Sequence, residues 1–224
     1  MTFIGPPKFE FMNRVLHAIV AFTLLIFTGS CGNDGVSAKL VGGGCDGCDL
    51  MFIGIPGSIS SVSTSPGYKE PGSRLLVKGY VYNADGTSSV PGVIIYYWQT
   101  DNTGLYSPKP GMDKRAERHG HIRGWVKSGE DGRYAIYTIR PAPYPNDIIP
   151  AHIHLSIKEP GISNPYYVDD LVFADDDLVT AEYRAAMHNR GGNGVMPITF
   201  NSDLQVAQHD LFLGLNIPNY PQRP

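Results

Sequence analysis

Two histidines one residue apart, His152 and His154, stand out in the stretch PAHIHLSI. Successive side chains of a β-strand point to opposite faces, so both imidazoles project from one face, and Ile153 and Leu155 from the other. Two neutral imidazoles on one face can bind the same metal ion. Taken alone, the pair is more typical of polar residues on a solvated strand face, and a metal site is the alternative.

Two tyrosines change the interpretation of this pair. Tyr144 lies in a proline-rich turn, residues 141–145, shortly before His152, and proline fixes the backbone there. Tyr106 follows a predicted strand and turn in WQTDNTGLYSPK. Phenolate is an anionic oxygen donor, so two phenolates and two imidazoles suit a hard ferric ion. Taken singly, each tyrosine is better explained as one of 13 in the chain; the ferric site depends on all four residues together.

Short strands must position these residues. The β-branched and aromatic runs at 75–82, 93–99 and 134–139 are separated by turns rich in Asn, Asp, Gly and Pro. Only residues 178–188 look helical, with Asp176 or Asp177 as the N-cap. Many short strands with one short helix predict a single all-β sandwich domain with long loops. Further strand candidates are GWVKS, AHIHLSIKE, DDLVFA, VMPITF and QVAQHDLFLGL.

Composition excludes several classes of protein. The chain has 224 residues, 42% of them hydrophobic, with 26 Gly and 18 Pro, which is typical of a globular protein with many turns. The formal net charge is −3 and no run of Lys or Arg occurs. We therefore expect no binding of nucleic acid.

The first thirty residues predict export. Arg14 precedes an uncharged, mostly apolar run at 15–27, followed by small residues. Such a run is shorter than the ~18 to 20 residues that span a bilayer, and it is typical of a signal peptide. Met12 is an alternative start to Met1, because it lies directly before Asn13 and Arg14.

Gly29 and Ser30 directly precede Cys31 and resemble a bacterial lipobox, in which the cysteine is lipidated; Thr28 departs from the usual branched aliphatic residue. We expect a protein of the bacterial cell envelope that meets the membrane only through a lipid at Cys31. The alternative is an ordinary signal peptide. The expected organisation is a signal peptide with lipobox at 1–31, a tether and N-terminal segment at 32–73, and the sandwich at 74–224.

Cys45 and Cys48 form a CxxC motif in the N-terminal segment. In an oxidising compartment this spacing favours a local structural disulfide. A redox-active pair is the alternative. A zinc site is not expected, because no second Cys pair completes it.

Three stretches together resemble the intradiol ring-cleavage dioxygenases, the family of catechol and protocatechuate 3,4-dioxygenases. They are PGVIIYYWQTDNTGLY, DGRYAIYTIRPAPYP and PAHIHLSI, in the order in which the family has them, and the likeness covers residues 75–178. The resemblance implies the β-sandwich of that family. It also implies an oxidoreductase that incorporates both atoms of O2 into a small catechol and gives a muconate-type diacid.

The resemblance assigns roles to four residues. It implies that Tyr106, Tyr144, His152 and His154 bind a non-haem Fe(III), with Tyr144 and His154 as the axial pair. In the family, the axial tyrosinate leaves when a chelating catechol arrives and takes up one of its protons. A homo-oligomer is compatible with the sequence.

The sequence departs from the family at three positions. Ile149 stands where the family usually has an arginine that steadies charge on the substrate ring, and Asn146 stands where protocatechuate-type enzymes have tryptophan. Asp170 aligns with a family glutamine. Arg123 and Arg140 are the candidates to supply the missing catalytic charge.

Two alternatives stay open. The first strands and turns also resemble the transthyretin-like and carboxypeptidase-regulatory modules, non-catalytic sandwiches with no reason to carry Tyr144, His152 and His154 together. The other alternative is a dioxygenase homologue that binds iron and has lost its activity with the arginine.

The remaining histidines have weaker patterns. His119 and His121 form a second His-x-His pair in a predicted loop, where lining the substrate entrance is a more fitting role than binding the metal. His188 and His209 have no partner pattern, and we expect them on the surface.

Overall fold

The computed structural model describes residues 39–145 and 148–222. The predicted signal peptide, the lipobox cysteine Cys31 and Asn146 lie outside these residues. Among the described residues, no helix is both long and apolar enough to cross a membrane.

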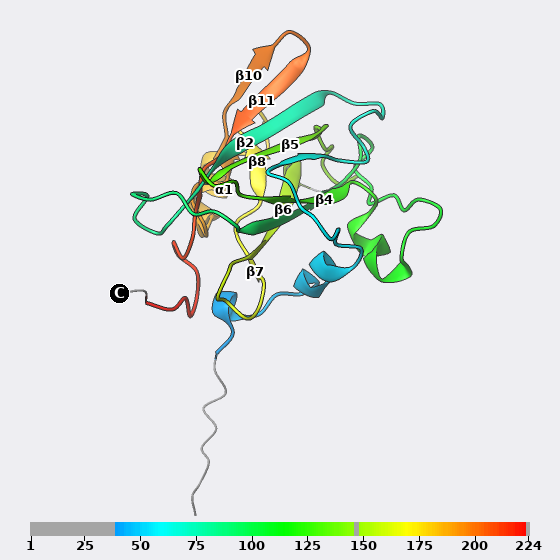
Figure 1. The fold of residues 1–224 in the computed structure, drawn as a ribbon. Helices are drawn as coiled ribbons and strands as arrows, with labels where there is room; N and C mark the ends of the chain where they lie inside the picture. Colours follow the sequence, from blue (N-terminus) through cyan, green and yellow to red (C-terminus); the bar gives the residue numbers. More distant parts are fainter. Residues whose placement is uncertain (1–38, 146–147, 223–224) are drawn as a thin grey trace, which may run out of the picture. The chain divides into compact units, whose positions relative to one another are not determined.

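Two six-stranded β-sheets form the domain, as the all-β prediction requires (Figure 1). In Figure 1 the β10–β11 hairpin, in orange, extends beyond the other strands. The first sheet has the order β1 (Val62–Thr64), β5 (Arg133–Ile139), β2 (Arg74–Tyr82), β11 (Leu204–Gln208), β10 (Ile198–Asn201), with β12 (Leu211–Phe212) also paired to β2. The second has the order β4 (Arg123–Lys127), β3 (Ile94–Gln99), β6 (His152–Lys158), β8 (Leu171–Phe173), β9 (Val195–Met196), with β7 (Tyr166–Tyr167) also paired to β6.

The core lies between the two sheets. Ile153, Leu155 and Ile157 of β6 are fully buried and share one hydrophobic cluster with Leu75 and Val77 of β2. Burial of each such side chain stabilises the fold by about 1.5–3 kcal/mol. Because side chains alternate along β6, the opposite face of the second sheet carries the polar residues of this strand.

Residues before the predicted start of the sandwich also join the sheets. β1 pairs in parallel with β5, so the first sheet begins ahead of Arg74. Met51 is fully buried against the outer face of the second sheet, and the Trp125 indole N–H donates to its carbonyl oxygen (2.7 Å). The N-terminal segment therefore covers the face on which the histidines lie.

Helical structure in the described residues is short. The predicted helix at 178–188 is wrong in its extent and its cap, because α1 (Ala181–Ala186) begins after Thr180, whose side chain accepts from the backbone N–H of Tyr183 (3.2 Å). The Asp176 carboxylate instead accepts from the backbone N–H groups of Leu178 and Ala151, which forms a turn ahead of the helix. Three 3-10 helices are η1 (Val41–Gly43), η2 (Cys48–Phe52) and η3 (Lys114–His119).

Cys45 and Cys48 are joined in a disulfide, as predicted for an oxidising compartment, with Cα atoms 5.4 Å apart. The sulfur of Cys48 lies 3.0 Å from the Ser156 hydroxyl of β6. The Cys48 end of the disulfide, at the start of η2, thus contacts the strand that carries the two histidines.

The prediction of an exposed His209 is wrong. The chain crosses at this residue from β11 to β12, and both strands pair with β2, which buries the imidazole. The Tyr134 hydroxyl donates to the carbonyl oxygen of His209 (2.8 Å) and lies 3.0 Å from its Nδ1.

Candidate metal centre

Four side chains bring their donor atoms together on the outer face of the second sheet. The Nε2 atoms of His152 and His154 lie 3.1 Å apart, on the same face of β6 as strand alternation predicts. The Tyr144 hydroxyl lies 3.1 Å from the first Nε2 and 3.4 Å from the second. The Tyr106 hydroxyl lies 2.7 Å from the Tyr144 oxygen and 2.7 Å from His154 Nε2. Two nitrogens and two oxygens therefore surround one point.

Hydrogen bonds on the far side of each imidazole set its tautomer. His152 donates its Nδ1–H to the carbonyl oxygen of Pro150 (2.7 Å), and His154 donates its Nδ1–H to a carboxylate oxygen of Asp170 (2.8 Å). Each Nε2 is then unprotonated, and its lone pair is available to a ligand. Partners of this kind orient the histidine ligands of metal ions.

The donor set fits a metal ion. Ligand atoms about 2 Å from one ion and at right angles to each other are about 3 Å apart, which is the range of the donor separations here. A cation between His152 and His154 would also remove the repulsion between their two lone pairs. The residues present can therefore hold a metal with two imidazoles and two phenolic oxygens.

Asp170 is the third member of the cluster that could bind a metal together with His152 and His154. Burial raises its pKa, but the attraction and hydrogen bond of His154 outweigh burial, so the pKa of Asp170 lies below its usual value. One oxygen of Asp170 accepts the Nδ1–H of His154. We therefore infer that the role of Asp170 is to orient the His154 ring.

The Tyr106 phenol needs a cation to ionise. Burial, followed by the hydrogen bond with Tyr144, raises the pKa of Tyr106 well above its usual value. Without a positive partner the phenol keeps its proton at neutral pH. A multivalent cation beside the oxygen reverses this preference, which favours a hard trivalent ion at this position.

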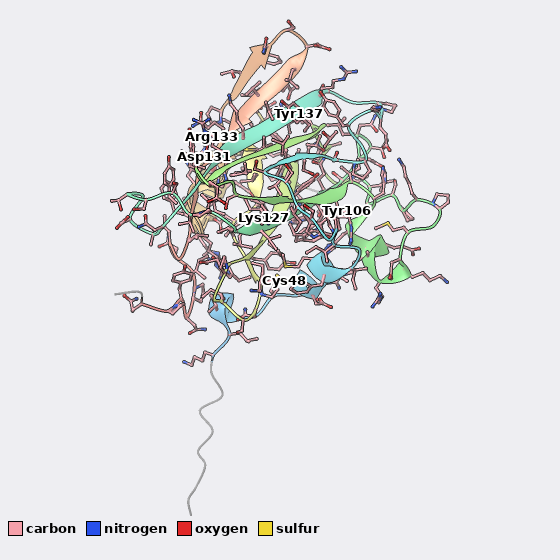
Figure 2. The ribbon with its side chains drawn as sticks, viewed as in Figure 1. Cys48, Tyr106, Lys127, Asp131, Arg133 and Tyr137 are labelled. Atoms are coloured by element: carbon pink, nitrogen blue, oxygen red, sulfur yellow. A yellow bond between two sulfur atoms is a disulfide. The ribbon has the colours of Figure 1, made fainter. Side chains whose placement is uncertain are left out.

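Asp101 holds the loop that carries Tyr106. Its Oδ1 accepts from the backbone N–H groups of Thr103 (2.8 Å) and Leu105 (3.2 Å), and its Oδ2 accepts from the Ser107 hydroxyl (2.6 Å). These bonds span both sides of Tyr106 and fix the backbone from which the ring projects. In Figure 2, Tyr106 and Cys48 are labelled on the side of the domain that carries the 3-10 helices.

The Tyr106 loop and the Tyr144 turn support one another. Thr100 donates its hydroxyl to the carbonyl oxygen of Ala142 (2.7 Å). Gly104 has φ +82°, and a Cβ there would lie 2.2 Å from the carbonyl oxygen of Pro143, so only glycine permits this approach. The position of one tyrosine thus depends on the loop of the other.

A stack of three rings supports His154. Trp98, directly opposite His154 in the pairing of β3 with β6, lies with ring centroids 4.8 Å from His154 on one side and 4.1 Å from His119 on the other. Burial, with Arg118 and His154 nearby, lowers the pKa of His119 to about 3, so this imidazole is neutral. Sequence reasoning missed Trp98, whose role depends on strand register.

The second His-x-His pair lies outside the donor cluster. His119 is buried beside Trp98, with its Nδ1 2.9 Å from the Tyr96 hydroxyl. His121 lies 2.6 Å from the carbonyl oxygen of Ser107 and 2.9 Å from the Glu70 carboxylate. Neither histidine lines the cavity described below, so the structure gives them supporting positions rather than the predicted place at an entrance.

The structure does not bring the two predicted catalytic arginines to the donor atoms. Arg123 pairs with Trp98 in the strand register, one strand farther from β6, and donates to the Tyr96 hydroxyl and the Ile53 carbonyl oxygen. Arg140 forms a two-point ion pair with Asp175, at 2.8 and 2.9 Å. Both guanidinium groups are thus engaged away from the four donor atoms, and a role of either arginine at the reacting ring stays a prediction.

A cavity of about 420 Å³ adjoins the donor cluster, since His154 and Asp170 form part of its wall. This volume suits a small molecule. The remaining lining residues are Tyr167, Val168, Asp169, Tyr183, Ala186, Met187 and His188.

Comparison with known proteins gives relatives of one kind. A family model described as Dioxygenase matches residues 59–192. The catechol 1,2-dioxygenase of Acinetobacter baylyi is 26% identical over 152 residues, which cover 56% of this chain and 48% of that protein. The 6-chlorohydroxyquinol 1,2-dioxygenase of Cupriavidus pinatubonensis is 33% identical over 107 residues, 40% of this chain and 37% of that protein. The chain thus spans about half or less of the length of these two relatives.

Solved structures share the fold. The dioxygenase domain of a carbohydrate-binding fusion protein from a cellulolytic Streptomyces superposes with a TM-score of 0.53 at 23% identity, over 73% of this chain and 97% of that one. The 3-chlorocatechol 1,2-dioxygenase of Rhodococcus opacus gives a TM-score of 0.53 at 20% identity, over 70% and 68% of the two chains. The two-sheet architecture is therefore common to all three.

Proposed function

The chain belongs to the intradiol ring-cleavage dioxygenases, and on this premise we propose that it cleaves a small catechol between its two hydroxyl-bearing carbons with O2. The product is a muconate-type diacid. Tyr106, Tyr144, His152 and His154 would hold the non-haem ferric ion on which the family generally depends. The observation that carries the proposal is the convergence of these four donor atoms at separations of 2.7 to 3.4 Å.

The ferric ion, when bound, supplies Lewis acidity toward a chelating diol and makes the ring susceptible to O2. Its protein ligands divide into fixed and releasable ones. Tyr106 is the braced ligand, because Asp101 holds the backbone on both sides of it. Tyr144 shares a contact of 2.7 Å with the Tyr106 hydroxyl and lies 3.1 and 3.4 Å from the two histidine Nε2 atoms.

By resemblance to the family, in which the axial tyrosinate leaves, Tyr144 is the ligand that we expect to leave when the diol binds. As a phenolate it is a base, and its oxygen can accept one substrate hydroxyl proton within hydrogen-bond reach. The prolines of its turn fix φ at their own positions and so restrict the backbone from which the ring projects. Proton acceptance at the Tyr144 oxygen is the step that this chain's own residues supply.

Ile149 affects the catalytic rate that we expect. It stands at the place of the family's arginine and is 41% exposed, and neither Arg123 nor Arg140 reaches the donors. Charge developing on the ring would then lack a guanidinium partner. This observation favours a second candidate function, an iron-binding homologue that holds catechols without cleaving them.

Export with lipidation at Cys31 is a further proposal about the same protein. The disulfide between Cys45 and Cys48 supports it, because disulfides persist in oxidising compartments. Mass spectrometry of the protein from bacterial membranes tests it: a diacylglyceryl adduct on Cys31 that is lost in Cys31→Ser is the expected result, and an unmodified Cys31 in the membrane fraction contradicts it.

Oxygen consumption tests the catalytic proposal. The iron-loaded protein is mixed with catechol, and O2 uptake and product absorbance are followed together. We expect equal molar amounts of O2 consumed and muconate formed, and loss of both in His154→Ala. Catechol binding without O2 uptake would support the non-cleaving homologue instead.

A further inference from the structure

Resting on the proposed dioxygenase activity, we propose that the cavity beside His154 selects catechols that carry a cationic side chain, such as a protonated primary amine. Asp169 is the specificity-determining residue. The same cavity would disfavour catechols that carry a carboxylate.

The position of the cavity makes it the place for a ring substituent. His154 belongs both to the four donors and to the cavity wall, and Asp170, which hydrogen-bonds His154, lines the cavity as well. A catechol bound to a metal at this centre would lie next to His154, from where its substituent can extend into the cavity. The volume, about 420 Å³, accommodates a short side chain in addition to the ring.

Apart from the ionisable imidazoles of His154 and His188, the charged groups of the described lining have one sign. Two carboxylates, those of Asp169 and Asp170, form part of the wall, and no Lys or Arg occurs among the lining residues that the structure describes. A carboxylate on the substrate would meet like charge there, whereas an ammonium group would meet opposite charge.

Asp169 and Asp170 differ in how their charges are used. Asp170 accepts the Nδ1–H of His154, so its carboxylate is committed to the metal ligand. Asp169 accepts the backbone N–H of Asn189 at Oδ2 (2.6 Å), a neutral donor that leaves the net charge of the carboxylate in place. Asp169 is half-buried on the cavity wall, where a charge is less screened than in open solvent.

Aromatic rings add a second attraction for a cation. Tyr167 and Tyr183 line the cavity, and an ammonium group is attracted to the face of such a ring. Burial, followed by repulsion from Asp170 and Asp169, raises the pKa of Tyr183, so its phenol stays neutral and contributes a ring rather than a charge. Carboxylate and aromatic walls together form a site for an amine.

Three catechols with side chains of similar length test the proposal. Dopamine ends in an ammonium, propylcatechol in a methyl group and dihydrocaffeate in a carboxylate. Anaerobic titration of the iron-loaded protein gives the Kd of each, and aerobic kinetics give kcat/KM. We expect dopamine to bind at least about threefold more tightly than propylcatechol at low salt, and dihydrocaffeate to bind most weakly. The spread should shrink at high salt.

Asp169→Asn supplies the matched variant. The amide oxygen still accepts the Asn189 N–H, so the turn is kept while the charge is removed. We expect the preference for dopamine over propylcatechol to vanish, with the Kd of propylcatechol unchanged. Asp203→Asn, in the exposed turn between β10 and β11, is the control and should leave the preference intact.

The outcomes separate this inference from the proposed function. Equal Kd values for the three catechols, or a dopamine preference that survives in Asp169→Asn, would overturn the inference and leave the dioxygenase. A protein that takes up no iron or binds none of the catechols would overturn both.

Discussion

His154 donates its Nδ1–H to Asp170 across 2.8 Å, while its Nε2 faces the other donors of the candidate metal centre. A single carboxylate thereby sets the tautomer and the direction of a ligand at the centre of the site. The same carboxylate forms part of the wall of the adjoining cavity. The candidate metal centre and the cavity thus meet at one residue pair.

Asp170→Asn should weaken iron binding about 10- to 100-fold, because the amide loses the negative charge that raises the basicity of His154. Competition with a chelator of known affinity measures the effect. Asp177→Asn is the matched control, since Asp177 is exposed and close in sequence. Unchanged affinity in Asp170→Asn would mean that the carboxylate does not orient the ligand.

Gly104→Ala should displace the Tyr144 turn. Gly104 and Gly111 both have φ +82°, but a Cβ meets the Pro143 carbonyl oxygen at 2.2 Å in the first case and nothing within 4 Å in the second. Both alanine variants should lose about 1 kcal/mol of stability from the left-handed backbone. Only Gly104→Ala should also lose iron affinity and change the absorption of the ferric protein. Equal behaviour of the two variants would argue against the shared support of the tyrosine loops.

Stability should fall as the pH drops from about 6.5 toward 4. Burial lowers the pKa of His209 to about 4, so between these values the unfolded chain binds a proton that the folded one does not, and the free energy of unfolding decreases as pH falls. His209 contributes up to about 3 kcal/mol to this loss, and His119, whose pKa is lowered to about 3, adds to it. Urea unfolding of the metal-free protein across this range measures it.

His209→Asn should be less stable at pH 7 but should show a flatter pH dependence than the parent protein. His188→Asn, at an exposed position, is the control and should keep the original slope. If His209→Asn retained the full slope, another group would be the source of the pH dependence.

Replacing both cysteines, Cys45→Ser with Cys48→Ser, should lower the free energy of unfolding by about 2 kcal/mol, the value expected for a short closed loop. Chemical unfolding with and without a reductant measures the difference. The reductant should destabilise the parent protein and leave the double variant unaffected. A parent protein that is insensitive to reductant would contradict a stabilising disulfide.

Local patterns could predict the strands and the shared face of His152 and His154, because alternation along a strand is a property of the backbone alone. The two tyrosines were found through their motifs, since nothing local indicates that Tyr106 and Tyr144 meet across 2.7 Å. That contact depends on two loops packing together.

Strand pairing and contacts between distant residues determine the features of the site that the sequence could not show. Trp98 supports His154 only because β3 and β6 pair in one register, and His209 is buried only because β11 and β12 both pair with β2. The sequence makes Arg140 a candidate for the catalytic charge. Its ion pair with Asp175 could not be predicted, because the two residues are far apart in the sequence.

The visible spectrum of the purified, iron-loaded protein tests the central claim most directly. A tyrosinate-to-Fe(III) charge-transfer band should appear, weaken and shift in Tyr106→Phe and Tyr144→Phe, move on anaerobic addition of catechol, and decay to a muconate spectrum when air is admitted. A colourless protein that takes up no iron, or a band that both phenylalanine variants leave unchanged, would contradict a ferric centre built on Tyr106, Tyr144, His152 and His154.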